Sequence, residues 1–547
     1  MLKHIMQWLW QYTKGIRLRL LSNCLIGITR VVAGLAFIYI SKQLIDMATN
    51  SSQYSSATFF IYLVLLAVFL LSQVVCNNVN YWLTNQTEIK MKNDVRHKLF
   101  VHLINVVWPG KNELHSGDIL NRLEEDVRVV TETICESLPN LAITLFNLIA
   151  AFLFLFHLSP TLAIGIAFIM PVFLLASKIY FRQLRLLTKN IRTTDSHVQS
   201  VLQENLQHRI VIQTMEQSEN MTDKLDNLQQ TLYGQTMSRT RFSTFSRSMV
   251  SAGFSIGYLT VFIWSIFQLK SGDITYGIMS AFLQLVNQIQ RPTVDLTRLI
   301  PKFVHATTSI DRLHELEEYP SEDVKERHWL DGKVGIRMQN VTYRYDEGSR
   351  NILRNFSHDF LPGSRTAIMG ETGAGKSTTF RLILSILQPN EGQIELYNEH
   401  EQIPTNAESR CNIVYVPQGN SLLSGTIRDN LLLGDPNATD EELYQVLHTT
   451  AADFVKDLPL GLDSLCRERG TGLSEGQAQR IAIARGLLRK GSILLMDEFS
   501  SSLDKETEKI LMQRLLENYP DKTMLFITHH EVIANYCTDI VKLERKL

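Results

Sequence analysis

The residues best suited to chemistry form the run GETGAGKST, which matches the pattern G-x-x-x-x-G-K-[ST]. Glycines in such a run let backbone N–H groups curl around a phosphate, and Lys376 would supply positive charge to the β- and γ-phosphates of a nucleotide. The hydroxyl of Ser377 is a suitable ligand for Mg²⁺. An apolar segment, RTAIMG, precedes the run and a helix-like segment, STTFRLILSIL, follows it. The sequence therefore predicts a nucleotide-binding loop formed by Gly370, Glu371, Thr372, Gly373, Ala374, Gly375, Lys376, Ser377 and Thr378.

Two neighbouring acids, Asp497 and Glu498, end the segment SILLMDE. The apolar residues before them indicate a buried strand, and carboxylates at its C-terminal end would emerge beside the phosphate loop. We expect Asp497 to hold the magnesium shell and Glu498 to lie near an attacking water as a general base. This pattern is weak alone, but it is strong when it follows a phosphate loop.

A second element suited to phosphate is LSEGQAQRIAIARGLL, Leu473 to Leu488. Ser474 and Gly476 stand where a side chain and a backbone N–H could both donate hydrogen bonds, just as a run of good helix formers begins. The same predicted domain thus carries two phosphate-facing elements. The second of them contains an acid, Glu475, which would repel a phosphate if its side chain were aimed at one.

The composition divides the chain into a strongly apolar first part and a second part that resembles a soluble domain. The chain has 547 residues, 45% hydrophobic, with a formal net charge of -1. Long apolar stretches occur up to about Pro301, and the rest has the composition of a soluble domain. A near-zero net charge gives no support to a nucleic-acid partner, which would need a clustered basic face. The six cysteines are scattered without CxxC pairs, so neither a disulfide framework nor a zinc site is expected.

The first half contains six candidate membrane spans, since a spanning helix needs roughly 20 mostly apolar residues. They are residues 20–45, 58–79, 138–158, 161–181, 249–269 and 274–294. The short connections carry almost no Lys or Arg, whereas the two long connections carry many. By the positive-inside tendency, the long connections and both termini are cytoplasmic. The long connections also have helical patterns, so we expect the helices to continue well beyond the bilayer.

The predicted domains follow from these patterns. Residues 1–19 are basic and amphipathic and are expected to stay on the chain as an interfacial helix, with a plain cytosolic helix as the alternative. Residues 20–310 form the transmembrane domain, residues 311–332 a linker, and residues 333–547 the nucleotide-binding domain.

Several spans contain polar side chains that are costly against lipid. Such groups should face other helices or a wet cavity. We expect them to line a path for a transported substrate; the alternative is that the amides only bond neighbouring helices. For the arginine in the first span, the alternatives are that it snorkels to the interface or pairs with another group. The candidates are Arg30, Gln284, Asn287, Gln288 and Arg291.

Together these motifs resemble the ATP-binding cassette family. Its remaining marks are present as VYVPQ, LSEGQ in place of the signature LSGGQ, SSLD, FITHH and YRYDEG. The resemblance implies that Gln418 contacts the metal and the water, that His529 contacts the γ-phosphate, and that Asp504 joins two ATPase domains. It also implies that Tyr345 stacks on adenine. The alternatives are a core tyrosine at 345 and His530 as the switch histidine.

The resemblance covers nearly the whole chain and is closest to exporter-type half-transporters. It implies a multi-domain membrane protein, with an all-α domain of six transmembrane helices followed by an α/β P-loop NTPase domain of the ABC type. The segment HSGDILNRLEEDV resembles the family's first cytoplasmic loop. The segment QENLQHRIVIQTMEQSE resembles the second, where a short helix docks on an ATPase domain. The expected location is a bacterial inner membrane, with the ATPase domain in the cytoplasm.

The resemblance also explains the two phosphate-facing elements. In this family two cassettes close head to tail, so Ser474, Gly476 and Gln477 would face the ATP held by a partner. A homodimer is the first expectation. The alternative is pairing with a different homologous half-transporter, with poor hydrolysis of the ATP under this chain's own signature. Glu475 replaces the family's usual glycine, and we expect its side chain to point away from the nucleotide.

The expected function is ATP-driven export of an amphipathic substrate, such as a drug, a lipid or a peptide, with ATP and Mg²⁺ as cofactors. The alternative is an ATP-gated channel, or a regulatory ATPase that moves nothing uphill. Nothing in the sequence selects one substrate class.

Overall fold

The computed structural model describes residues 12–49, 55–107, 116–322, 326–345, 350–466 and 472–544. The chain forms two compact units, one made of Met1–Lys98 with Leu120–His314 and the other of Leu99–Ile119 with Glu315–Leu547. Most of the predicted interfacial helix, residues 1–11, lies outside the described residues.

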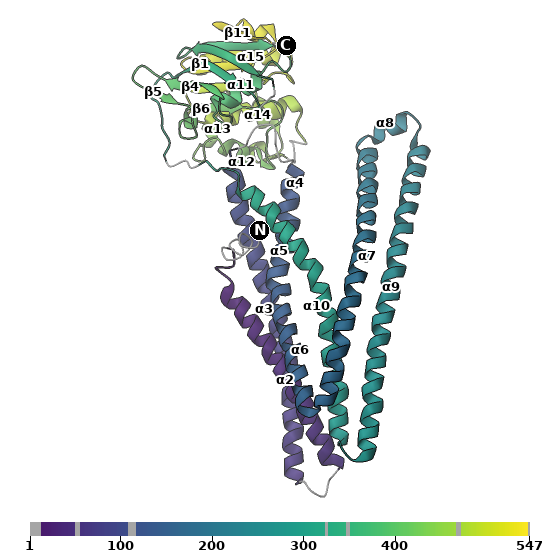
Figure 1. Cartoon of the computed structure of the whole chain (residues 1–547). Coiled ribbons are helices and arrows are strands. Elements are labelled where there is room, and N and C mark those ends of the chain that lie inside the picture. Colours follow the sequence, from purple (N-terminus) through teal and green to yellow (C-terminus); the bar gives the residue numbers. More distant parts are fainter. Residues whose placement is uncertain are drawn as a thin grey trace. The chain divides into compact units, whose positions relative to one another are not determined.

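The first unit is helical (Figure 1). Five of the six predicted spans lie within one helix each, and the sixth, 274–294, begins two residues before α10. The described helical elements up to residue 317, of which residues 99–104, 116–119 and 315–317 belong to the second unit, are α2 (Arg17–Thr49), α3 (Ser56–Ile104), α4 (Ser116–Asn121), η2 (Arg122–Asp126), α5 (Val127–Glu132), η3 (Thr133–Ser137), α6 (Leu138–Leu158), α7 (Pro160–Gln207), α8 (Arg209–Thr214), α9 (Ser218–Ser271) and α10 (Tyr276–Glu317). Among the described residues, four helical stretches are long and apolar enough to cross a membrane: Arg17–Thr49, Ser56–Ile104, Gly117–Leu158 and Ser218–Ser271. The spans predicted in α7 and α10 stay predictions.

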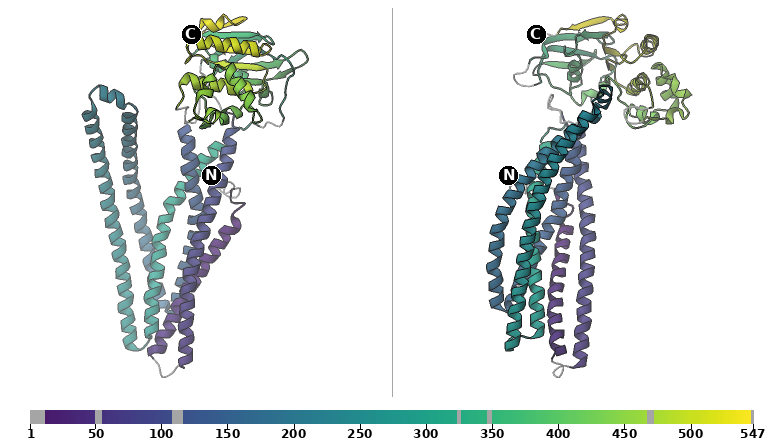
Figure 2. Two further views of the ribbon diagram at one scale, coloured as in Figure 1. Left: turned by 180° about the vertical axis from the view of Figure 1, so that it is seen from behind. Right: turned by 90° about the vertical axis from the view of Figure 1, so that its right-hand side faces the viewer.

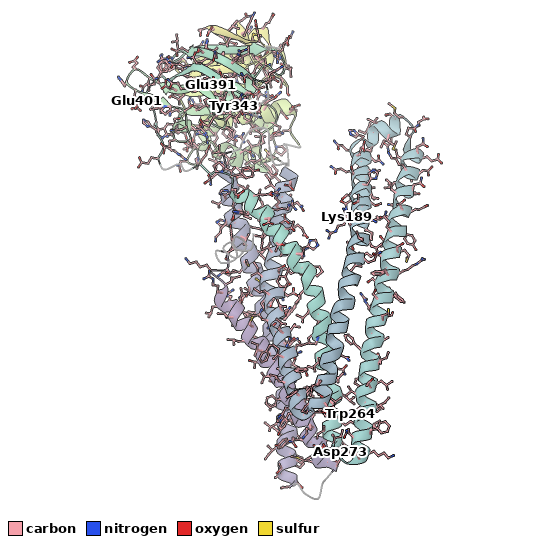
Figure 3. All side chains as sticks on the ribbon, in the orientation of Figure 1. Lys189, Trp264, Asp273, Tyr343, Glu391 and Glu401 are labelled. Atoms are coloured by element: carbon pink, nitrogen blue, oxygen red, sulfur yellow. The ribbon has the colours of Figure 1, made fainter. Side chains whose placement is uncertain are left out.

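The helices are much longer than a bilayer requires. α9 has 54 residues and α7 has 48, whereas roughly 20 residues cross the hydrocarbon core. At 1.5 Å per residue, α9 extends for about 80 Å. The short helix α8 joins α7 to α9, and the two long helices run side by side (Figures 1 and 2). Figure 3 shows Trp264 and Asp273 near the turn from α9 into α10, and Lys189 well away from it on α7.

The N-terminus of α10 is capped by a carboxylate from another helix. Asp46 of α2 is buried, and its Oδ1 accepts a hydrogen bond of 2.9 Å from the N–H of Gly277. A negative charge is favourable at a helix N-terminus, where N–H groups lack partners within the helix. A Cβ on Gly277 would lie 2.2 Å from the carbonyl oxygen of Lys42, so only glycine allows this approach.

Two π-helical turns, η2 and η3, interrupt the helix that runs from α4 to α6. Such turns insert a residue into the regular helix and are frequent at functional sites. The first of them buries Asp126, whose Oδ1 accepts a hydrogen bond of 2.7 Å from the Ser309 hydroxyl of α10. Its Oδ2 lies 3.1 Å from the Arg312 guanidinium. These contacts tie α10 to the η2 turn.

The second unit contains a parallel sheet, an antiparallel sheet and a small two-stranded sheet. The parallel sheet has the order β11-β3-β10-β9-β6, and the four-stranded sheet has the order β2-β1-β4-β5. Figure 3 labels Tyr343 on β1 and Glu391 on β4, which are neighbouring antiparallel strands. The strands are β1 (Gly335–Tyr343), β2 (Leu353–Phe360), β3 (Arg365–Gly370), β4 (Glu391–Tyr397), β5 (Gln402–Pro404), β6 (Ile413–Val416), β7 (Gly425–Thr426), β8 (Leu465–Cys466), β9 (Ile493–Asp497), β10 (Thr523–Ile527) and β11 (Asp539–Leu543).

Helices surround the parallel sheet and bury it. Every residue of β9 and β10 is buried, as expected for parallel strands covered on both faces. The helices are α11 (Lys376–Ile383), α12 (Ile427–Leu432), α13 (Asp440–Thr449), α14 (Glu475–Leu488), α15 (Lys505–Asn518) and α16 (Glu531–Ala534), with 3₁₀ turns η4 (Ser409–Asn412), η5 (Asp453–Asp457) and η6 (Gly461–Asp463).

The topology of this sheet gathers the predicted site. β3, β10 and β9 are adjacent and parallel, so their C-terminal ends meet at one edge. The phosphate loop follows β3, the two acids end β9, and the histidine pair follows β10. Ligands of open parallel sheets bind at this edge.

Candidate active site

The phosphate loop has a backbone that requires glycine. Gly370 has a φ of 155° and Gly375 a φ of 96°, values that residues with a Cβ rarely adopt. A Cβ on Gly370 would lie 2.3 Å from the carbonyl oxygen of Leu543, and one on Gly375 would lie 2.8 Å from Cγ2 of Ile352. The loop then leads directly into α11, which starts at Lys376. Backbone N–H groups at this helix start are available to an anion.

Lys376 folds back across the loop. Its Nζ donates to the carbonyl oxygens of Gly370, at 2.7 Å, and Glu371, at 3.2 Å. It also lies 3.1 Å from Nε2 of His529. The side chain is 7% exposed, so its ammonium group is largely shielded from water. Phosphate oxygens are stronger acceptors than these carbonyls, because hydrogen bonds between two charged groups are the stronger kind.

Glu498 lies in a strained conformation at the end of β9. Its φ is 44°, in the left-handed region that residues with a Cβ rarely adopt. Its N–H donates to the carbonyl oxygen of Ile527 at 3.0 Å. Its Oε2 accepts from Nε2 of Gln418 at 2.6 Å, and its Oε1 lies 3.5 Å from Nε2 of His529. The structure therefore brings Lys376, His529, Glu498 and Gln418 into one line of contacts.

Asp497 has the properties of a magnesium ligand. It is 3% exposed, and its Oδ1 has no hydrogen-bond partner among the described residues. Burial raises the pKa of Asp497, the nearby charge of Glu498 raises it further, and a hydrogen bond from Ser377 lowers it. A buried carboxylate oxygen without a partner, beside a serine hydroxyl, fits Mg²⁺. This ion uses one or two protein ligands together with phosphates and water.

The side chains of the two adjacent histidines contact different partners. His529 contacts Lys376 and approaches Glu498. His530 instead points Nδ1 at Oε1 of Glu508, 2.9 Å away, and that carboxylate is buried. The geometry favours His529 over His530 as the residue that reaches a nucleotide phosphate.

Tyr345 lies at the rim of the loop. Its hydroxyl is 3.2 Å from Oγ1 of Thr378, and its ring meets that of Tyr343 edge-on, with centroids 5.1 Å apart. It is half-buried and packs against the hydrophobic core of the second unit. Residues 346–349, which follow it, lie outside the described residues.

The second phosphate-facing element starts α14 with a reciprocal cap. Ser474 Oγ accepts from the N–H of Gln477 at 3.2 Å, and Oε1 of Gln477 accepts from the N–H of Ser474 at 2.9 Å. Ser474 and Glu475 are exposed. Within the described part of the chain, no hydrogen bond joins this turn to the phosphate loop. Asp504 likewise caps its own helix, α15, by accepting from the N–H groups of Glu506 and Thr507.

Comparison with known families decides the identity of this arrangement. Residues 20–293 match the model of the ABC transporter transmembrane region, and residues 353–501 match the ABC transporter model. The chain belongs to the ABC transporter family. It therefore combines a helical transmembrane domain with an α/β ATPase domain, which confirms the predicted fold class, and it couples ATP hydrolysis to transport.

Relatives of this ABC transporter match it along nearly its full length. It is 28% identical over 545 residues to a "Putative multidrug export ATP-binding/permease protein" of Staphylococcus aureus strain bovine RF122 / ET3-1, covering 98% of this chain and 94% of the relative. The protein of the same description in strain NCTC 8325 / PS 47 is similar to the same extent, 28%. The structure of a bacterial Atm1-family ABC exporter with ATP bound has the same fold, with a TM-score of 0.80 at 20% identity. The match covers 97% of this chain and 94% of that one.

The polar residues of the transporter's predicted spans differ in what they contact. Gln288 of α10 donates to Oδ1 of Asn147 on α6 at 3.1 Å, and Arg30 of α2 donates to Oδ1 of Asn77 on α3 at 2.7 Å. Gln284 donates to Ser280 and Asn287 to the carbonyl of Leu283, both within α10. The side chain of Arg291 lies outside the described residues. Gln288 thus bonds a neighbouring helix, and Asn287 is the exposed amide of this set. The substrate path along these residues stays a prediction.

Three polar residues near these sites escaped the sequence analysis. Asn147 is a lone amide within the apolar run ITLFNLIAAF, and Asp46 is an acid at the end of the first span. Both are polar groups within hydrophobic helices, which is a signal that could have identified them. Gln479, whose contact with Glu498 is described below, had no such signal because its helix has a mixed composition.

Replacing Asp497 by asparagine should stabilise the protein in the absence of ligands. Burial disfavours the charged form of Asp497, and asparagine removes that charge without changing the size of the side chain. We expect Tm in nucleotide-free buffer with a chelator, near neutral pH, to rise by a few degrees, while Mg²⁺-dependent ATP hydrolysis is lost. Thermal unfolding and phosphate release measure the two effects. A lower Tm would contradict the assignment of Asp497 as a ligand held ready for a cation.

Replacing Gly476 by alanine should destabilise the ATPase domain. A Cβ at this position would lie 2.6 Å from the carbonyl oxygen of Ser502 and 3.2 Å from Cδ2 of Leu503. Relief of such a clash costs about 1–3 kcal/mol, and Tm should fall accordingly in thermal unfolding. Gly234→Ala is the control, because a Cβ there meets nothing within 4 Å. Equal Tm values for the two variants would show that the approach of Ser502 is not tight.

Proposed function

We propose that this chain is one half of a dimeric exporter that uses ATP and Mg²⁺ to move an amphipathic substrate, such as a drug, a lipid or a peptide, across a bacterial inner membrane. The observation that carries the proposal is the line of contacts formed by Lys376, His529, Glu498 and Gln418 beside Asp497, whose buried Oδ1 has no hydrogen-bond partner among the described residues. These groups lie at the C-terminal edge of one parallel sheet. The same chain carries helices long and apolar enough to span a membrane.

In the proposed reaction, a water oxygen bonds to the γ-phosphorus as the bond to ADP breaks. Glu498 accepts the proton that the water loses, at Oε1, because Oε2 is already engaged by Gln418. Lys376 and His529 hold the γ-phosphate, and Tyr345 supports the base. Mg²⁺, held by Ser377, Asp497 and Gln418, would supply electrostatic stabilisation of the phosphate oxygens.

The two phosphate-facing elements of one chain support a dimer. Ser474 and Glu475 at the start of α14 are exposed, the turn caps itself, and among the described residues no hydrogen bond joins it to the chain's own phosphate loop. In the proposed dimer, Ser474, Gly476 and Gln477 of each copy face the nucleotide on the other copy's loop, and Asp504 lies at the seam. We infer a homodimer, with the ATPase domains in the cytoplasm. A heterodimer with a homologous half-transporter is the other outcome of the test.

The test uses the purified full-length chain in sealed liposomes with the ATPase domains outside. A fluorescent hydrophobic cation, a labelled phospholipid and a labelled apolar peptide serve as probes. ATP-dependent accumulation of one probe above its external concentration supports the proposal. ATP-dependent release down a gradient, without accumulation, would replace it with a gated channel. Static light scattering distinguishes a homodimer from a chain that needs another partner.

A further inference from the structure

The backbone of Glu498 is fixed from several directions, and one of them is unexpected. Its N–H donates to Ile527 of β10, and its carbonyl oxygen accepts from the N–H of Ser501 at 3.3 Å. The same carbonyl accepts a second bond of 3.3 Å from Nε2 of Gln479, which belongs to α14. Gln479 is fully buried, with an exposed fraction of 0%. A side chain of α14, the helix that begins within the LSEGQ motif, therefore contacts Glu498, the proposed general base.

Gln479 helps to hold the backbone of Glu498 in place, but its buried amide oxygen lowers the stability of the fold. Glu498 has a left-handed φ of 44°, and such a conformation persists only when surrounding contacts over-determine it. Gln479 supplies one of those contacts. Its own Oε1, however, is buried and has no hydrogen-bond partner in the part of the chain that the structure describes, and an unsatisfied buried acceptor opposes folding. A residue selected for stability alone would be apolar here.

The neighbouring turn of α14 is packed equally closely against the loop after Glu498. The carbonyl of Ser502 approaches Gly476 so tightly that a Cβ there would lie 2.6 Å from it. Gly476 and Gln479 are three residues apart and share one helix face. The first turns of α14 thus contact both the peptide of Glu498 and the loop that follows it.

We propose that Gln479 is a positioning residue that holds Glu498 in its left-handed conformation and links the first turns of α14 to this chain's own catalytic carboxylate. The inference rests on the proposed function, in which the N-terminus of α14 faces the nucleotide on the second copy. One helix then contacts the partner's nucleotide at its first residues and, one turn later, the backbone that aims the base at the chain's own nucleotide. Nucleotide binding at the partner's site thereby affects the position of Glu498 at the chain's own site.

The test is the variant Gln479→Met, which keeps the length of the side chain and removes both the donor and the unpartnered oxygen. We expect kcat for ATP to fall about 10–100-fold, the size of effect that a small displacement of a catalytic group produces. ATP affinity should stay within about twofold, because Gln479 does not touch the phosphate loop. The Tm of the variant should equal or exceed that of the wild type.

A matched control is Gln513→Met, which changes an exposed glutamine on α15 and should leave kcat and Tm unaltered. A Gln479→Met variant with wild-type kcat would overturn the inference. So would one whose Tm falls, since that result assigns Gln479 a structural role. Absence of ATPase activity in the wild-type chain would instead overturn the proposed function. The two failures are therefore distinguishable.

Discussion

Glu498→Gln should lower ATP turnover by about 10²–10⁴-fold, the usual contribution of a general base, while nucleotide binding is retained. Glutamine has the same length and backbone preferences, so it can keep the bond to Gln418 and the strained φ of this position. It lacks the negative oxygen that accepts the proton from water. Single-turnover phosphate release measures the loss, and equilibrium binding of a fluorescent ATP analogue measures retention.

Glu517→Gln is the control for this variant, because Glu517 is an exposed acid on α15 outside the site. It should hydrolyse ATP at the wild-type rate. If Glu498→Gln released phosphate as fast as the control, Glu498 would not be the general base. Another residue of the site, such as His529, would then have to accept the proton.

Lys376→Met should weaken ATP binding by at least about 30-fold, equivalent to about 2 kcal/mol, which is the lower end for removing one partner of a buried charged contact. The ammonium group is nearly buried and lies over the phosphate loop, where it bonds the carbonyls of Gly370 and Glu371. Methionine fills the same space without charge, so the loop should remain folded. Equilibrium binding of ATP and Tm together separate lost affinity from unfolding.

The control here is Lys490→Met, which removes an exposed lysine just after α14. Its ATP affinity should match that of the wild type. Equal affinities for the two lysine variants would mean that the loop backbone alone binds the phosphates, and that Lys376 has no part in holding them.

The local part of the site could be predicted from the sequence because its chemistry is contiguous. The glycines, Lys376 and Ser377 occupy one short run, and the acids directly follow a fully apolar strand. Parallel-sheet geometry then predicts that the phosphate loop and the two acids lie at the same edge of the sheet, and the described topology brings them together at that edge. The conformation of Glu498 was not predictable in this way, because its φ of 44° depends on contacts from β10 and α14.

The long-range contacts of the membrane domain were also outside the reach of sequence patterns. Asp46 and Gly277 are separated by 231 positions, and nothing local indicates that one caps the other. Likewise, the polarity of Gln288 did not indicate its partner, Asn147 on a neighbouring helix, and its place on a substrate path stays a prediction. Periodicity predicts which face of a helix is polar, but it does not predict what that face meets. The two π-helical turns also shift the face of the helix that contains them.

The cap that Asp46 provides has a consequence for how the membrane domain can move. Two helices from opposite ends of the domain's sequence are fastened where α10 begins, through a backbone approach that leaves no room for a larger residue than Gly277. Packed contacts of this kind switch between discrete arrangements and do not stretch gradually. The parts of α2 and α10 next to this contact should therefore move together as one rigid body during transport, and any bending of these helices must be concentrated elsewhere along their length.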